Sequence, residues 1–371
     1  MTFNRPYITG NEIQYLNKVL GSTKIAGNGK YTKKCQSYFV NKYGFKKALL
    51  TTSCTDALEM CAILANISSG DEVIMPSYTF VSTANAFLLR GAKIKFVDSR
   101  EDHPGMNEDT IEANITDKTK AIVVVHYAGV AVDMDKVMSL ANKYDLLVIE
   151  DAAQAIDSYY KDTPLGSIGH LSSFSFHETK NIISGEGGLL AINDGEFTQR
   201  SEIIWEKGTN RSAFFRGEVD KYGWVDIGSS FLPSELIASF LYAQLEQLVV
   251  IQSQRKKIWT QYFEFLKTLK NKVQLPNIPE YATNNAHMFY FVCSSIEERT
   301  ALLSHLKEKN IYAVFHYQSL HKSEFFRNNN HKKLMPLSDR YSDCLVRLPF
   351  YIGLTDDEIN YVAESVLEFY K

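Results

Sequence analysis

From about residue 48 to residue 200, the chain alternates between short apolar runs and longer segments that have the periodicity of an α-helix. The apolar runs are rich in β-branched residues and have the length of strands. The expected strands are KKALLTTS, DEVIMPS, AKIKFVDS, KAIVVVHYAG, DLLVIEDAAQA, HLSSFSFH and GGLLAIN, and the expected helices are TDALEMCAILANI, TFVSTANAFLLRG, NEDTIEANI and DMDKVMSLANKYD. Strands that alternate with helices pair mostly in parallel, with helices on both faces of the sheet. The alternation therefore predicts an α/β fold with a mostly parallel central sheet.

The remainder of the chain is organised differently. Residues 201–235 are irregular and rich in polar and aromatic side chains, and residues 234–270 keep a helical period long enough for one bent helix. After Pro276 the expected strands are AHMFYFVCSS, YAVFHYQSL and LVRLPFYIG, and the expected helices are SIEERTALLSHLKEKN and TDDEINYVAESVLEFY. A chain of 371 residues suits two domains. We therefore expect a large domain over residues 1–240, and a linking helix with a smaller α+β domain over residues 241–371.

Composition and charge exclude several classes of function. The net charge of −3 gives no reason to expect nucleic acid or an anionic membrane as a partner. The N-terminal residues lack the basic start and apolar stretch of a signal peptide, and no apolar run is long enough to span a bilayer. The five cysteines form no CxxC pair, which favours reduced thiols in a cytoplasmic protein and no metal site.

In sheets of this kind, ligands bind beyond the carboxyl ends of the strands, so the residues that follow each run are the candidates for a site. Asp151 ends the run VIED, where a buried carboxylate needs a cationic partner unless it caps the next helix. Thr55 and Asp56 stand at a predicted helix start, where backbone N–H groups suit a phosphate, although the same residues are ordinary helix caps. Phe80 follows another strand and could stack on a planar ligand, although aromatic residues there are more often part of the core.

Lys180 stands in FSFHETKNIISGEGGLL, between an apolar run and a glycine cluster. A lysine amine is a nucleophile only when it is neutral, and burial near another cation lowers its pKa. A strand-end lysine, a ring-holding carboxylate and a phosphate cradle form the set that pyridoxal phosphate (PLP) requires, with the lysine in a Schiff base and the aspartate on the protonated ring nitrogen. Ser175 could bond the phosphate, and Gln154, three residues after Asp151, could reach the same ligand. No GxGxxG or GK[ST] motif supports a dinucleotide or P-loop site.

Five motifs stand in an order that resembles the DegT/DnrJ/EryC1/StrS sugar aminotransferases over nearly the whole chain. They are PSYTFVSTANAF, VVVHYAGV, EDAAQ, SFSFHETKN and GEGG. The resemblance implies the PLP-dependent transferase type I fold, with PLP bound by the large domain. It also implies that Lys180 forms the Schiff base and that Asp151 pairs with the pyridine nitrogen. The other cofactor contacts that it implies are Gln154 at the ring hydroxyl, Phe80 on the ring face, and Thr55, Asp56 and Ser175 at the phosphate.

The resemblance also implies substrates and a partner. Residues 206–236, 285–291 and 314–321 narrow it to members that use glutamate to aminate C4 of dTDP-4-keto-6-deoxy-D-glucose, giving dTDP-4-amino-4,6-dideoxy-D-galactose for a surface glycan. The family implies a homodimer with its active site at the interface, and many members donate an asparagine to the partner's site where this chain has Ser230. The candidate substrate contacts are Arg211, Arg216, Lys221, His316 and Tyr317, with His126 and Tyr127 as weaker candidates, and each is otherwise an ordinary solvated or structural side chain.

Several alternatives stay open from the sequence alone. The amine could take the gluco configuration at C4, as in dTDP-4-amino-4,6-dideoxy-D-glucose, or enter at C3 of a 3-ketosugar. A sugar dehydratase of the same fold has histidine in place of the Schiff-base lysine, so Lys180 argues against it. A noncatalytic regulator fits the fold but gives no reason for the set of Asp151, Gln154 and Lys180, and an NAD-dependent enzyme would need the missing glycine fingerprint.

Overall fold

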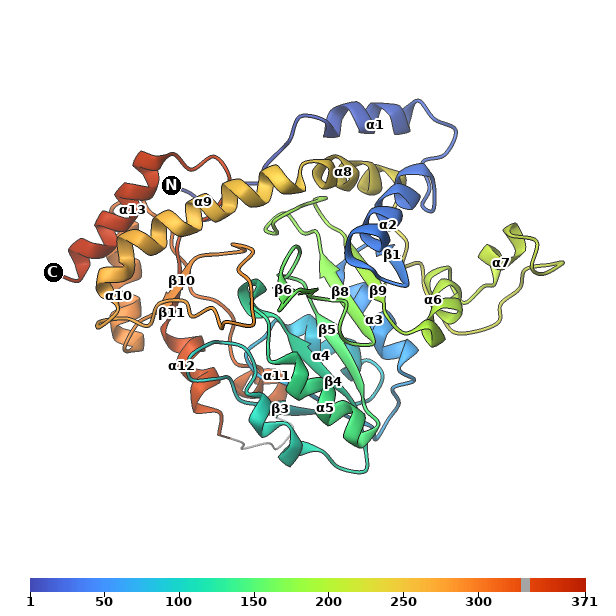
Figure 1. Ribbon diagram of the computed structural model, residues 1–371, viewed down its shortest axis with the longest axis horizontal. Coiled ribbons are helices and arrows are strands. Elements are labelled where there is room, and N and C mark those ends of the chain that lie inside the picture. Colours follow the sequence, from blue (N-terminus) through green and yellow to red (C-terminus); the bar gives the residue numbers. More distant parts are fainter. Residues whose placement is uncertain (328–333) are drawn as a thin grey trace.

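A computed structural model describes residues 1–327 and 334–371 of the chain (Figure 1). At its centre lies a seven-stranded sheet with the strand order β1-β9-β8-β5-β4-β2-β3. The strands are β1 Lys47–Thr51, β2 Glu72–Pro76, β3 Lys93–Val97, β4 Thr119–Val125, β5 Leu147–Asp151, β8 Leu171–Ser175 and β9 Gly188–Ile192. Neighbours pair in parallel except at β9, which runs antiparallel to both β1 and β8. The predicted α/β fold with a mostly parallel sheet is confirmed.

Helices cover both faces of this sheet (Figure 1), because successive residues of a strand point to opposite sides. In β4, Ile122 and Val124 join a core cluster with α2, α5 and α8, whereas Ala121 and Val123 join a second cluster with α3, α4 and α6. Burial on both faces explains why the strands read as continuous apolar runs. The helices are α2 Lys30–Tyr43, α3 Cys54–Leu64, α4 Val81–Leu88, α5 Met134–Tyr144, α6 Thr198–Trp205 and α8 Glu235–Glu246, and α1 Glu12–Leu20 packs along α8.

The C-terminal part of the chain forms a separate core cluster around two short strands. β10 (Tyr290–Val292) and β11 (Leu345–Arg347) pair in antiparallel fashion. The helices that contribute to this cluster are α9 Leu248–Leu266, α10 Ile296–Glu308, α12 Pro336–Cys344 and α13 Asp356–Phe369. The α+β character expected of this region is confirmed, whereas the domain boundary between residues 240 and 241 stays a prediction.

Short elements connect these parts of the molecule. Two are helical, α7 Arg211–Phe215 and α11 Glu324–Arg327, and β6 Tyr159–Tyr160 pairs with β7 Thr163–Pro164. The 3-10 turns are η1 Glu108–Thr110, η2 Glu112–Asn114, η3 Tyr127–Gly129, η4 Gly195–Phe197, η5 Lys267–Leu269 and η6 Leu320–Lys322. The segment that carries α7 projects from the rest of the chain (Figure 1).

Two of the expected elements are wrong. NEDTIEANI forms the turns η1 and η2 instead of an α-helix. Its asparagine side chains bond the local backbone, since Asn107 accepts from the N–H of Asp109 at 3.1 Å and Asn114 donates to the carbonyl of Thr110 at 2.7 Å. Residues 312–320 form no strand, and in this described stretch only Val314 pairs with Arg347. The left-handed backbone of Tyr317, with φ of 32°, ends the extended conformation there.

The long helical segment is divided at Gln247, which has φ of −107° and ψ of 7°. Within the described residues, no single helix is long and apolar enough to cross a membrane. The pair Glu235–Glu246 and Leu248–Leu269 passes that test of length and composition only when taken together, with a bend of 64°. Apolar residues of both helices, including Leu241, Leu245 and Ile251, are buried in the protein core.

Candidate active site

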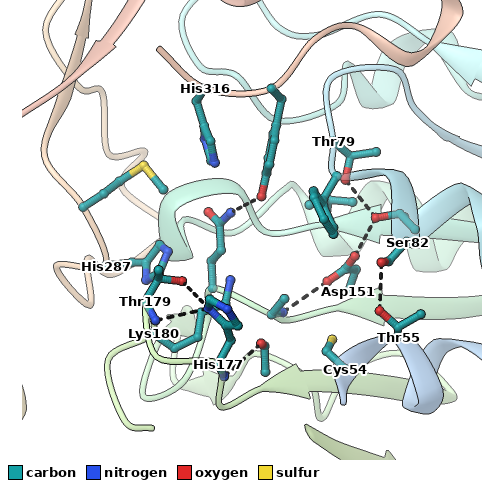
Figure 2. A pocket seen from close by; sticks show the side chains of 18 of the residues that line it. Cys54, Thr55, Thr79, Ser82, Asp151, His177, Thr179, Lys180, His287 and His316 are labelled. Atoms are coloured by element: carbon teal, nitrogen blue, oxygen red, sulfur yellow. Dashed lines mark hydrogen bonds between the residues drawn. The ribbon is translucent and has the colours of Figure 1, made fainter. Parts of the chain in front are cut away.

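A cavity of about 580 Å³ opens at the carboxyl ends of the parallel strands. Cys54 and Thr55 at the start of α3, Asp151 at the end of β5 and Lys180 after β8 all line it (Figure 2). The C-terminal part of the chain and the N-terminal residues supply the remaining walls, which include Phe3, Asn4, His287, His316, Arg347 and Phe350. The cavity is thus built where the rule for parallel sheets places a ligand.

Asp151 is a buried carboxylate, with 5% of its surface exposed. Its Oδ2 accepts a hydrogen bond from the hydroxyl of Thr83 at 2.7 Å, and its Oδ1 accepts one from the N–H of Ala153 at 3.2 Å. Burial raises the pKa of Asp151, although these two hydrogen bonds favour its charged form. Among the described residues, no cationic side chain forms an ion pair with it. A buried carboxylate that lacks a cationic partner fits the protonated nitrogen of a pyridine ring.

Lys180 lies in the turn after β8, where its N–H bonds the carbonyl of His177 at 2.9 Å. Burial lowers the pKa of its amine, with a smaller contribution from the charge of Arg347, while Cys54 and Asp151 act in the opposite direction. In the part of the chain that the structure describes, no hydrogen bond or ion pair holds Nζ. The side chain therefore presents an uncommitted amine with an increased neutral fraction, which is what a nucleophile or a general base needs.

The start of α3 carries Thr55, one of the residues predicted to bind a phosphate. Thr55 Oγ1 donates to Ser82 Oγ at 2.8 Å (Figure 2), and Ser175 lines the same cavity. Asp56 does not line it, because its N–H donates to the capping oxygen of Ser53 at 3.0 Å and its carboxylate accepts from the hydroxyl of Thr52. Ser53 is thus the residue that caps α3, Asp56 lies in its first turn, and the phosphate contact expected of Asp56 stays a prediction.

The residues expected at the ring lie together. Gln154 Oε1 accepts from the N–H of Ala128 at 2.6 Å, and its Nε2 donates to the hydroxyl of Tyr317 at 2.9 Å. Phe80 is 54% exposed, and its ring centre lies 5.9 Å from that of Tyr317. His316 stacks on Tyr317 with ring centres 3.6 Å apart. An exposed aromatic ring beside a fixed amide is a suitable surface for a planar ligand.

His126 and Tyr127, the two weaker candidates for substrate contacts, are held by other side chains of the protein. His126 forms a fully buried pair with Glu150, with Nε2 and Oε2 2.9 Å apart, and it does not line the cavity. The hydroxyl of Tyr127 lies 2.7 Å from Nδ1 of His316, so Tyr127 supports a cavity residue from behind.

Four predicted residues of the polar segment do not reach the cavity of their own chain. As the described residues define it, the cavity is lined by none of Arg211, Arg216, Lys221 and Ser230. Arg216 is already paired with two carboxylates, and Arg211 lies over the ring of Phe215 at 5.2 Å. Ser230 is exposed and bridges to Glu206 through the backbone.

His287 and Arg347 are among the cavity residues that the sequence analysis did not single out. His287 lines the cavity (Figure 2), and its Nδ1 lies 2.8 Å from Oδ1 of Asn181, the neighbour of Lys180. Arg347 is the one arginine that lines the cavity in the described part of the chain. Both stand inside segments expected to be strands, where periodicity distinguishes buried from exposed positions and carries no signal for a site.

Comparisons with known proteins agree with this geometry. The model of the DegT/DnrJ/EryC1/StrS aminotransferase family matches residues 6–367. GDP-perosamine synthase of Escherichia coli O157:H7 is 32% identical over 370 residues, which cover 99% of this chain and 97% of that protein. Spr1654 of Streptococcus pneumoniae, a proposed sugar aminotransferase, is 25% identical; its pyridoxamine phosphate (PMP) form gives a TM-score of 0.93, covering 100% of this chain and 98% of that chain. Its PLP form gives a TM-score of 0.92 with the same coverage. DesV of S. venezuelae is 26% identical, with a TM-score of 0.89 and coverage of 97% and 94%.

Proposed function

This chain belongs to the DegT/DnrJ/EryC1/StrS aminotransferase family and is a PLP-dependent sugar aminotransferase, and we propose that it moves the amino group of glutamate to C4 of dTDP-4-keto-6-deoxy-D-glucose. The product is dTDP-4-amino-4,6-dideoxy-D-galactose, a precursor for a surface glycan. The observation that carries the chemistry is the uncommitted amine of Lys180, a half-buried residue, in one cavity with the buried carboxylate of Asp151. The choice of sugar rests on the resemblance of residues 206–236, 285–291 and 314–321 to enzymes that make this product.

The residues present fit PLP. Asp151 would accept the hydrogen bond of the ring N–H, which supplies the cationic partner that its buried carboxylate otherwise lacks. Gln154 would lie at the ring hydroxyl and Phe80 on the ring face, while Thr55 and Ser175 would bond the phosphate at the start of α3. When bound, PLP supplies an electron sink for the carbon that loses a proton.

The amine of Lys180 then has two roles. As the attachment point of PLP it holds the ring in the cavity, and as a free amine it moves protons. In the donor half of the reaction, Nζ takes the proton from Cα of glutamate. In the acceptor half, Nζ returns a proton to C4 of the sugar. The lowered pKa of Lys180 favours the neutral amine that the first of these steps requires.

A single-turnover experiment tests this proposal. We expect glutamate to remove the visible absorption of the PLP-loaded protein, dTDP-4-keto-6-deoxyglucose to restore it, and NMR to show an axial amine at C4. Lys180→Ala should reduce turnover by at least about 1000-fold, because both the attachment point and the proton carrier are lost. Lys256→Ala, at an exposed position of α9, is the matched control and should retain activity. Near-normal turnover by Lys180→Ala would remove Lys180 from the mechanism.

The same experiment separates the alternatives. An equatorial amine would change the product to the gluco epimer, and no return of absorption would point to another ketosugar, first of all the 3-keto isomer. The 32% identity to an enzyme named for GDP-perosamine favours a second candidate, a GDP-linked 4-ketosugar. The dTDP-linked and GDP-linked ketosugars should therefore be compared at equal concentration, and a higher kcat/KM for the GDP form would correct the nucleotide in our proposal.

We also propose that the protein is a homodimer that acts in the cytoplasm. In a dimer, Ser230 and the basic residues Arg211, Arg216 and Lys221 would serve the cavity of the second copy, where the sugar diphosphate needs cationic donors. This arrangement is supported by the finding that, among the described residues, these four do not line the cavity of their own chain. The free state of all five cysteines supports a reducing compartment.

A further inference from the structure

Arg255 is a buried cation in the middle of α9, and only 4% of its surface is exposed. Ile251, four residues before it, belongs to a core cluster of the central sheet, whereas Ile258, three residues after it, belongs to the C-terminal core cluster. The helix runs along both parts of the chain (Figure 1). Arg255 therefore lies where α9 passes from one core to the other. It does not line the cavity, as the described residues define it.

The guanidinium of Arg255 is held by neutral groups. Nε donates to the carbonyl of Ala286 at 3.0 Å, and Nη2 donates to the carbonyl of His287 at 2.6 Å. The group lies over the ring of Phe350 at 4.8 Å, and in the described part of the chain no carboxylate forms an ion pair with it. Burial lowers the pKa of Arg255 to about 9, so the group still carries its charge at neutral pH. Because burying a charge without an ionic partner costs free energy, stability alone does not account for an arginine here.

Arg255 supports two residues of the cavity wall from behind. His287 and Phe350 both line the cavity, and Arg255 donates to the carbonyl of the first and lies over the ring of the second. Nε and Nη2 lie on one edge of a planar group, which lets them meet two successive carbonyls at once. Ala286 has a left-handed backbone, with φ of 53°. Such a backbone persists only where the surrounding structure holds it, and the two bonds from Arg255 contribute to that hold.

The other hydrogen bonds of this segment lead to the residues that we assign to PLP. Asn285 Nδ2 donates to the carbonyl of Gln154 at 2.8 Å, and Asn285 Oδ1 accepts from the N–H of His287 at 3.1 Å. The ring of His287 contacts Asn181, the neighbour of Lys180, with Nδ1 and Oδ1 2.8 Å apart. A shift of the segment would therefore displace the wall beside the amine that carries protons.

We infer that Arg255 is a positioning residue of the active site, which fixes His287 and thereby the wall beside Lys180 from outside the cavity. The inference rests on the proposed function for its effect on turnover. The charge of Arg255 also lowers the pKa of His287, after the larger effects of burial and of Lys180, so it helps to keep the ring neutral.

A positioning role predicts a particular kinetic effect. Lys180 moves the protons in both halves of the proposed reaction, and a small displacement near a reacting group can slow a reaction by about 100-fold. Substrate binding uses other walls of the cavity, so KM should change little. A loss of kcat with nearly unchanged KM is the expected signature.

The test compares Arg255→Lys and Arg255→Met with the wild type, all loaded with PLP. Lysine keeps the charge and can reach one carbonyl, whereas methionine has a similar length with neither charge nor donor. In proton NMR, the ring hydrogen between His287 and Asn181 should exchange with water at least about 10-fold faster in Arg255→Met, with a smaller change in Arg255→Lys. Arg340→Met, in α12, is the control, because its guanidinium also lies over an aromatic ring, that of Tyr341 at 6.0 Å, and does not line the cavity.

Kinetics on the same proteins complete the design. The rate at which saturating glutamate removes the visible absorption should fall by at least about 10-fold in Arg255→Met, while KM for glutamate stays within about 3-fold. A lower Tm with unchanged exchange at His287 and an unchanged rate would overturn the inference in favour of a structural role. A higher KM at an unchanged rate would also overturn it. If Arg255→Met does not fold, the same measurements on Arg255→Lys decide. Because neither readout needs a sugar, the inference can be judged even if the proposed ketosugar is not aminated.

Discussion

At the scale of single residues, His287 shows how a network of amides fixes the state of a side chain. Asn181 Nδ2 donates to Oε1 of Gln252 at 2.8 Å and to the carbonyl of Asn285 at 2.9 Å. Its Oδ1 is therefore the atom that faces Nδ1 of His287, and Nδ1 must carry the hydrogen. The lone pair on Nε2 is left for the cavity. Burial lowers the pKa of His287 well below its usual range, so this acceptor persists near neutral pH.

Replacing Asn181 by Asp should make His287 titrate in the physiological range. A carboxylate beside Nδ1 stabilises the imidazolium, so the pKa of His287 rises and the ring gains a proton as the pH falls through that higher value. Nitrogen NMR should show a protonation step of His287 between about pH 5 and pH 8 in Asn181→Asp and none in the wild type. Asn41→Asp, at an exposed site on α2, is the control. A wild-type His287 that titrates near pH 6.5 would contradict the network.

The sign for stability follows from the same shift. In the wild type the folded state binds fewer protons at His287 than the unfolded state does, so stability falls as the pH drops below about 6.5. In Asn181→Asp this loss should be smaller, because the folded ring can also take a proton. Thermal melting at pH 5 and pH 7 measures the difference between the two variants.

Which residues could be predicted from the sequence depended on where they stand. Asp151 ends β5 and Lys180 lies in the turn that follows β8, and the topology of parallel strands brings such positions to one edge of the sheet. The hydroxyl of Thr83 donates to Asp151 and also contacts the hydroxyl of Thr79, four residues earlier. Because a spacing of four residues occurs throughout every helix, it gave no sign of this contact. Arg347 reaches the cavity from a different core through β11, and such a contact between distant segments leaves no local pattern.

At the scale of elements, the alternation of apolar runs with segments of helical periodicity predicted the sheet. The runs are apolar throughout because each strand buries both of its faces. The strand order was not predictable, since any of several orders buries the same apolar residues. The errors at residues 107–115 and 312–320 have local causes, namely asparagine side chains that compete for the backbone and the left-handed residue Tyr317. Neither cause changes hydrophobic periodicity, which was the signal used.

Gly188 joins two elements at the cofactor site. It starts β9 and pairs with Thr51 on one side and Ser175 on the other, so the strand cannot shift. A Cβ at this position would lie 2.4 Å from the carbonyl carbon and oxygen of Ser53 and 2.5 Å from the nitrogen of Cys54. The absence of a side chain therefore lets the first turn of α3 approach the strand, at the place where we propose that the PLP phosphate binds.

Gly188→Ala should displace the start of α3. We expect a loss of about 1–3 kcal/mol in the free energy of unfolding, as for other overpacked sites, and a dissociation constant for PLP at least about 10-fold higher. Chemical denaturation and titration of the visible absorption measure the two effects. Gly195→Ala is the control, because a Cβ there meets nothing closer than Lys46 Nζ at 3.7 Å. Unchanged PLP binding in Gly188→Ala would show that the cradle tolerates the shift.

At the scale of the whole molecule, large apolar side chains are exposed together on the segment that carries α7. Trp224 is 84% exposed, Phe215 69% and Tyr222 55%, and Val225 and Ile227 belong to the same stretch. The segment projects away from the chain's own core (Figure 1). A cluster of this kind is expected to be covered by another protein surface, and the family resemblance makes a second copy of this chain the partner that we propose.

Trp224→Glu should therefore dissociate the dimer. A tryptophan at the centre of an interface commonly contributes at least about 2 kcal/mol, so the dimer dissociation constant should rise by at least about 30-fold. Analytical ultracentrifugation over a range of concentrations measures it, and titration with PLP on the same samples tests whether cofactor affinity falls as the dimer dissociates. Ile296→Glu is the control, because it places a carboxylate at another exposed apolar residue, in the first turn of α10 where the helix dipole favours it. If wild type and Trp224→Glu are both monomers that bind PLP equally well, the cavity is complete within one chain and Ser230 has no role at a second one.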